Sequence, residues 1–110
     1  GVLALDKVRA LGKGISVPIE FEWDPEKAVR NLGKHGVSFE EAASAFGDSR
    51  SLTIPDPEHS IGEDRSILLG MTAIGQLLVV VFVESGPAER IISARMANRR
   101  ETRQYMDENE

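Results

Sequence analysis

The sequence contains no cysteine, and only 5% of its 110 residues are aromatic. Without cysteine the chain has no disulfide framework, no thiolate metal site and no thiol nucleophile. This absence is compatible with a reducing compartment, and we predict a cytoplasmic location. The longest apolar run, residues 77–83, is too short to span a bilayer, and the first residues lack the pattern of a signal peptide. We therefore predict no membrane association.

Signature motifs of several enzyme classes are also missing. The sequence has no GxSxG, HExxH or GxGxxG pattern and no glycine-rich phosphate loop. The net charge of −5 argues against a protein that coats nucleic acid indiscriminately. Two classes stay open: an enzyme with a local basic site, and a protein whose acidic faces meet a basic partner.

The chain length is that of one domain with a single core. A hydrophobic content of 41% and a charged content of 28% are ordinary for a globular protein. Residues 1–18 show no clear period, and we predict that they form a poorly packed or extraneous arm. A single domain over residues 19–110 is predicted to follow.

Two helices are predicted in the first half of the domain, after a short strand over residues 19–23. Asp24 and Pro25 have the N-cap and first-position pattern of a helix start, and Gly36 is a typical helix end. Ser38 and Glu41 have the spacing of a capping box, which predicts the start of another helix, and this helix is predicted to end at Gly47. The predicted apolar stripe of the first helix consists of Ala28, Val29 and Leu32.

The hydrophobic period then changes to two, which is typical of strands. Strands are predicted over residues 51–55, 65–72 and 76–84, and a further strand carries Arg90 to Arg95. Asn98 and Glu101 have the capping-box spacing that opens a C-terminal helix. The segregation of helices and strands predicts an α+β domain: a short N-terminal strand, two helices, a four-stranded antiparallel meander and a C-terminal helix.

Five arginines lie within fourteen residues near the C-terminus: Arg90, Arg95, Arg99, Arg100 and Arg103. Arg99 and Arg100 would fall in the first turn of the last helix, where free N–H groups and the helix dipole favour an anion such as phosphate. Strict alternation would place Arg95 on the opposite face of its strand from Arg90. The cluster either binds an RNA backbone and stabilises charge on a transferring phosphate, or it is a solvated basic helix paired with nearby acids.

Candidates outside this cluster also have two readings each. His35, after Lys34, could transfer protons near neutral pH, or both residues could complement a helix C-terminus. Arg65 could add a cation to a phosphate site or pair with the acids just before it. Tyr105 could pack in the core or place a hydroxyl at the edge of the site. The acidic loop around His59 lacks the spacing of a calcium loop, so we predict a solvated loop and no metal site.

Four segments, which together span about residues 21–105, carry a family resemblance. They are FEWDPEKAVRNLGKHGVSFEEAASAF, PDPEHSIGEDR, LLVVVFVE and RIISARMANRRETRQY. In this order they resemble the BrnT family of toxins. The resemblance implies a small ribonuclease toxin of a type II toxin–antitoxin module, with a fold related to RelE. It also implies neutralisation by a cognate BrnA antitoxin, whose DNA-binding domain lets the complex repress its own operon.

The resemblance extends to individual site residues. The family's Lys-His-Gly pattern falls on Lys34, His35 and Gly36, and its acidic-then-Arg strand start falls on residues 63–65. Its Arg-Ile-Ile-Ser-Ala-Arg pattern falls on residues 90–95, and its C-terminal Glu and Tyr fall on Glu101 and Tyr105.

The resulting hypothesis is an endoribonuclease that uses neither a metal nor another cofactor and that inhibits translation. Arg65 and Arg95 are predicted to stabilise the phosphate, and His35 is the candidate for proton transfer. The predicted RNA-binding residues are Lys34, Arg90, Arg99, Arg100 and Arg103. The alternative is a non-catalytic antitoxin-binding module that acts in operon autoregulation. A DNA-binding regulator in its own right is a third hypothesis, and the absence of a helix-turn-helix signature argues against it. The resemblance implies that DNA is contacted only through the antitoxin.

Overall fold

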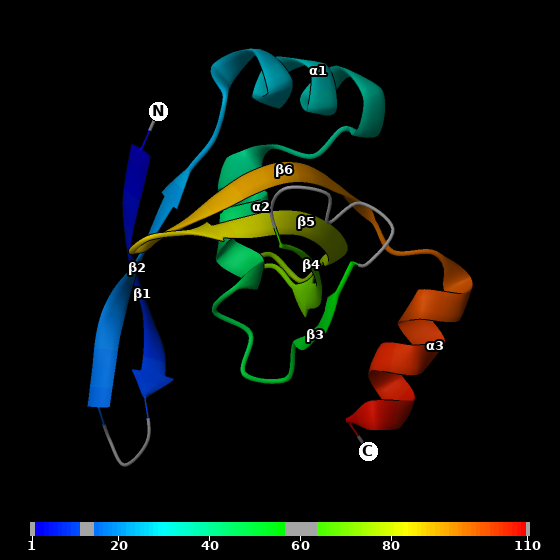
Figure 1. Cartoon of the computed structure of the whole chain (residues 1–110). Helices are drawn as coiled ribbons and strands as arrows, with labels where there is room; N and C mark the ends of the chain where they lie inside the picture. The colour runs from blue at the N-terminus through cyan, green and yellow to red at the C-terminus, as the bar shows by residue number, and fades with distance from the viewer. Residues whose placement is uncertain (1, 12–14, 57–63, 110) are drawn as a thin grey trace.

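The computed structural model describes residues 2–11, 15–56 and 64–109 of the chain. Over these residues the protein is an α+β domain with three helices and one six-stranded sheet of order β1-β2-β6-β5-β4-β3 (Figure 1). The predicted fold class is therefore confirmed. No helix in these ranges is long and apolar enough to cross a membrane.

The predicted meander forms one half of the sheet. β3 (Leu52–Pro55), β4 (Arg65–Met71), β5 (Leu77–Ser85) and β6 (Ala88–Met96) pair antiparallel in chain order. The near-continuous apolar strand β5 lies between β4 and β6, in the interior of the sheet.

The predicted short strand at residues 19–23 is the end of a longer strand, β2 (Ile15–Glu22). β2 pairs antiparallel with β1 (Val2–Leu11) and parallel with β6, over residues 20–22 and 88–90. The backbone of the predicted N-terminal arm thus extends the sheet at one edge. Whether the arm is extraneous to the domain stays a prediction.

Both predicted helix starts in the first half are present. Asp24 caps α1 (Pro25–His35) by accepting a hydrogen bond from the Glu26 N–H, and Ser38 caps α2 (Phe39–Ala45) in the same way through Glu41. Gly36 ends α1 in the left-handed region, with φ of 70°, which favours glycine.

The predicted apolar stripe of α1 is wrong for two of its members, since Val29 is 71% exposed and Leu32 50% exposed. α1 turns Asn31 inward instead, and this side chain is only 7% exposed. Asn31 accepts a hydrogen bond from the Ala94 N–H (3.0 Å) and donates to the Ala94 carbonyl (2.8 Å) and the Val37 carbonyl (3.0 Å). Because β2 pairs with β6 no further than Arg90, the amide of Asn31 takes the place of a missing strand beside Ala94.

Helix α2 packs against β4, β5 and β6, and α1 runs along β6. Helix α3 (Arg99–Glu108) lies at the other end of the molecule from the β1–β2 hairpin (Figure 1). The main core forms between α2 and the sheet face that carries Phe82, Ile91 and Ala94. Trp23 and Phe39 meet edge to face there, with their ring centroids 5.9 Å apart. A second, smaller core forms where Tyr105 of α3 packs on the opposite sheet face.

Candidate nucleic-acid interface

The strand β6 contains a bulge that decides where its arginines point. Arg90 lies opposite Val83 of β5 and Ile91 opposite Phe82, whereas Ser93 lies opposite Val81 and Arg95 opposite Val79. Ile92 is therefore the extra residue. Val79, Val81 and Val83 alternate regularly on one face of β5, so Arg90 and Arg95 share that face. The prediction that they lie on opposite faces is wrong, because the bulge breaks the alternation.

Arg65 joins this face from β4. Arg65 and Arg90 both lie opposite Val83, on either side of it, and residues that lie directly opposite one another point to the same face. Both side chains are half-buried. Glu22 of β2 lies opposite Arg90 in the same row and adds a negative charge beside it. The structure thus brings together two of the predicted cations at one end of this face.

Arg95 lies on the same face toward its other end. The step from Val83 to Val79 corresponds to roughly 13 Å along β5. Between the two ends the face carries half-exposed Ile67, Val81 and Ser93, whereas the opposite face carries the main core and packs against α2. We call this surface, with Arg65, Arg90 and Arg95 at its ends, the basic sheet face.

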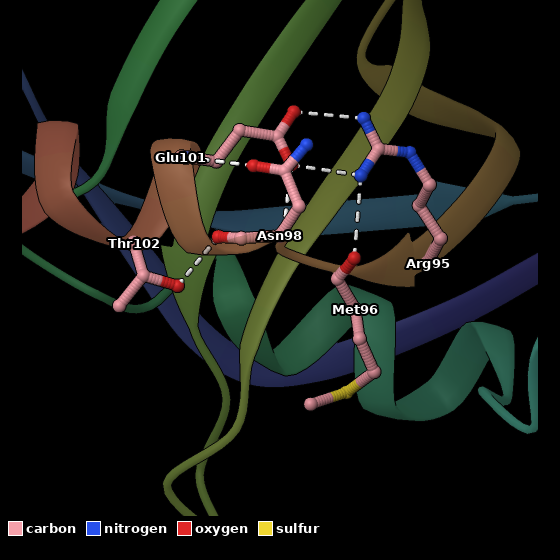
Figure 2. A network of polar contacts seen from close by, with 5 residues as sticks. All are labelled: Arg95, Met96, Asn98, Glu101 and Thr102. Atoms are coloured by element: carbon pink, nitrogen blue, oxygen red, sulfur yellow. Dashed lines mark hydrogen bonds and ion pairs between the residues drawn. The ribbon is translucent and has the colours of Figure 1, made fainter.

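Arg95 is engaged by Glu101 in a fork-to-fork ion pair (Figure 2). The two terminal nitrogens of Arg95 each donate to one carboxylate oxygen at 2.8 Å, and Nη1 also donates to the Met96 carbonyl at 3.2 Å. The hydrogen bonds that Arg95 donates to Glu101 raise the pKa of Arg95 and lower the pKa of Glu101, although the burial of each group opposes its shift. The side chain of Arg95 is still 41% exposed.

The start of α3 has the predicted capping box. The Asn98 side chain accepts from the Glu101 N–H at 2.8 Å, and Glu101 accepts in return from the Asn98 N–H at 2.9 Å (Figure 2). The anion at this helix start is therefore the protein's own Glu101, in the place where the sequence predicted a phosphate.

The arginines of α3 are separate from the basic sheet face. Arg99, Arg100 and Arg103 are all exposed, and Arg100 and Arg103 line a depression with Asp107 and Glu108 along the helix. This arrangement agrees with the solvated basic helix that the sequence left open. Their predicted contact with RNA stays a prediction.

Lys34 and His35 occupy the last turn of α1, as predicted. Lys34 is exposed and His35 is half-buried. Because α1 contacts β6 and runs in the same sense as β6 in Figure 1, His35 lies toward the Arg95 end of that strand. The role of His35 in proton transfer stays a prediction.

A pocket of about 140 Å³ lies beside Arg95, between the sheet and α3. Its walls are aliphatic side chains and its polar members come from β6 and α3. The lining residues are Leu52, Ile54, Ile67, Leu69, Val79, Arg95, Glu101 and Gln104. Gln104 was not identified from the sequence as a residue of this site. Its position, about one helical turn after Glu101, places it on the same helix face and could have indicated this.

Asp48, also missed from the sequence, anchors α3. Its carboxylate accepts from the Tyr105 hydroxyl at 2.7 Å, from the Met71 N–H at 2.8 Å and from the Arg50 N–H at 2.9 Å. Burial opposes the charge of Asp48, but these hydrogen bonds outweigh it and lower its pKa. Burial first, and then the bond to Asp48, raise the pKa of Tyr105. Tyr105 is 6% exposed, so its packing role is confirmed.

Most of the predicted acidic loop, including His59 and Glu63, lies outside the described residues. Asp56 and Asp64 at its ends are described, and the Asp56 N–H donates to the Arg65 carbonyl at 2.8 Å. This bond continues the β3–β4 pairing to the position of Arg65.

The protein is thus a small α+β domain, and one partly exposed face of its antiparallel meander carries arginines. The family described as "Ribonuclease toxin, BrnT, of type II toxin-antitoxin system" matches residues 23–101, and the chain belongs to this family. A solved structure, the 1.1 Å crystal structure of the Brucella abortus ribonuclease toxin BrnT, is 23% identical with a TM-score of 0.57. The match covers 72% of this chain and 96% of that chain, and it shows the shared fold. A comparison with curated proteins found no match.

Proposed function

We propose that this toxin cleaves RNA without a metal ion, as an endoribonuclease related to RelE, and thereby inhibits translation. The observation that carries the proposal is the basic sheet face, where a bulge and two strand pairings bring Arg65, Arg90 and Arg95 to one side of the sheet. The overall net charge of the chain is −5, yet three arginines lie on this one partly exposed face. This local concentration of positive charge supports a binding site for a polyanion.

In the proposed reaction the ribose 2′-oxygen attacks the adjacent phosphorus and the bond from phosphorus to the 5′-oxygen breaks. The products are a 2′,3′-cyclic phosphate and a 5′-hydroxyl. One proton leaves the 2′-hydroxyl and one reaches the departing 5′-oxygen. The phosphate gains negative charge in the transition state, and guanidinium groups stabilise this charge without a change in protonation.

Arg65 is the first candidate for that role, with Arg90 beside it, since both lie in one row of the sheet. Arg95 would hold a neighbouring phosphate through its exposed side, with Glu101 fixing the guanidinium. His35 is the proposed proton-transfer group, because imidazole is the side chain that most often acts as a general acid or base. Lys34, Arg99, Arg100 and Arg103 would add charge around the path of the RNA.

The partner side of the proposal follows from family membership. A toxin of a type II module has an antitoxin partner. We propose that a BrnA-like antitoxin neutralises this chain by covering the basic sheet face, and that DNA is contacted only through the antitoxin.

The test is cleavage of a labelled RNA by the purified full chain in the presence of EDTA, together with growth arrest on expression. Arg65→Ala and Arg95→Ala are each expected to lower the cleavage rate by about a hundred- to a thousand-fold. Arg30→Ala is the matched control, since Arg30 is an exposed arginine on α1 with no proposed role. Cleavage that stops in EDTA would refute the metal-free reaction, and full activity of Arg65→Ala would remove that residue from it.

A second candidate function has one observation in its favour. The ion pair with Glu101 neutralises much of the charge on Arg95, which would suit a non-catalytic antitoxin-binding module that acts in operon autoregulation. Titration with RNA at two salt concentrations separates the two functions, because phosphate contacts weaken steeply with salt. Weak, salt-sensitive binding without cleavage products supports the module.

A further inference from the structure

The aliphatic pocket beside Arg95 has no role in the proposed cleavage reaction. We infer that it binds one nucleobase of the RNA, with room for the six-membered ring of a pyrimidine. This inference rests on the proposed function of the basic sheet face and names the part of the substrate that is read there.

The size of the pocket fits a single flat ring. An apolar protein cavity of about 150 Å³ takes up benzene, and this pocket has a volume of about 140 Å³. Its walls include Ile54, Ile67 and Leu69, and Ile54 is 55% exposed at the mouth. A pyrimidine ring fills this space, whereas the second ring of a purine extends past the mouth into water.

The polar groups of the pocket lie on one side, where α3 borders it. Gln104 is exposed and carries an amide that both donates and accepts hydrogen bonds, and Glu101 adds a carboxylate. The edge of a pyrimidine also presents donors next to acceptors. Apolar walls that hold the ring and an amide that meets its edge are the usual means of reading an unstacked base.

The distance between the arginines of β6 and the pocket matches the distance between the phosphate and the base of one nucleotide. Arg95 lines the pocket and shares its face with Arg90 on β6, so an RNA backbone that follows these arginines passes the pocket mouth. Ile67 on β4 is two strands away from β6, which corresponds to roughly 10 Å. A phosphate over β6 therefore leaves its base directed across β5 toward the aliphatic wall.

Methyl NMR of the full chain tests the inference, with cytidine 5′-monophosphate as the probe and ribose 5-phosphate as the baseless comparison. The aromatic ring is expected to shift the methyl signals of Ile54 and Ile67, and ribose 5-phosphate is not. The exposed Ile74, in the turn between β4 and β5, supplies the reference signal. Equal shifts with both probes, or none with the nucleotide, overturn the inference. The second result is also the one expected if the pocket holds an apolar side chain of a protein partner.

A matched pair of variants sharpens the result. Ile54→Ala removes part of the pocket wall and is expected to weaken nucleotide binding at least five-fold. Ile74→Ala makes the same change on another exposed isoleucine and is expected to leave binding unchanged. Equal binding by wild type and Ile54→Ala overturns the inference. RNA cleavage without nucleotide-induced methyl shifts refutes the base pocket alone, whereas methyl shifts without RNA cleavage refute the proposed nuclease and leave the base pocket standing.

Discussion

Arg90 and Arg95 point to the same face of β6 although five positions separate them, because Ile92 is a bulge. If all six residues from Arg90 to Arg95 alternated without a bulge, one of the two arginines would point toward the core that contains Ile91 and Ala94. The bulge takes Ile92 out of the register and thus keeps the core pattern and the cationic pattern of the strand compatible. Bulges beside functional sites commonly redirect a side chain in this way.

The first prediction is that different arginines contribute unequally to the rate of RNA cleavage. Arg90→Ala is expected to lower the rate of RNA cleavage by about a hundred-fold, since Arg90 lies in one row with Arg65. Arg103→Ala is expected to lower it only a few-fold, because Arg103 lies along the exposed side of α3. Single-turnover cleavage with excess enzyme measures both. Equal losses in the two variants would contradict the basic sheet face as the site.

The second prediction concerns the ion pair that joins β6 to α3. Glu101→Gln loses the charge and one of the two acceptors for Arg95, and it is expected to destabilise the fold by about 1 kcal/mol. Cleavage is expected to fall about ten-fold, because the guanidinium of Arg95 is no longer fixed. Urea denaturation and cleavage kinetics measure the two effects. Glu108→Gln, an exposed change on the same helix, is the control, and a Glu101→Gln protein with faster cleavage would show that the pair restrains activity.

The third prediction concerns pH and the anchor of α3. The folded protein holds the pKa of Asp48 below its ordinary value of 3.8, so its charged form stabilises the fold above that value. This contribution is lost as the pH falls through the folded pKa. The difference in unfolding free energy between wild type and Asp48→Asn is therefore expected to be largest near pH 6 and to shrink below pH 4. Urea titrations over this range measure it, and a difference that grows toward low pH would refute the assignment.

The fourth prediction concerns Asn31, which completes the open edge of β6. Asn31→Ala leaves the N–H and the carbonyl of Ala94 without this partner in a buried place, at an expected cost of about 2–4 kcal/mol. Lys27→Ala, at an exposed position of the same helix, is expected to change stability by less than about 0.5 kcal/mol. Chemical denaturation compares the two variants. A cost below about 1 kcal/mol for Asn31→Ala would show that water replaces the amide.

The sequence alone determined the local structure of this protein. Asp24 with Pro25, Ser38 and the Asn98–Glu101 capping box marked the helix starts correctly, because a cap is a contact between residues two or three positions apart. The local hydrophobic pattern also marked strands of the meander, by alternation in β4 and by a near-continuous apolar run in β5.

Tertiary structure decided the rest. The bulge at Ile92 is defined only against the register of β5, and Asn31 is buried only because β2 stops short of Ala94. Two of the three partners of Asp48 come from residues 23 and 57 positions away. Such contacts depend on which segments the packed core brings together, and no pattern within a few residues encodes that pairing. The face on which the arginines meet was therefore fixed by strand pairing, although their number and types were plain in the sequence.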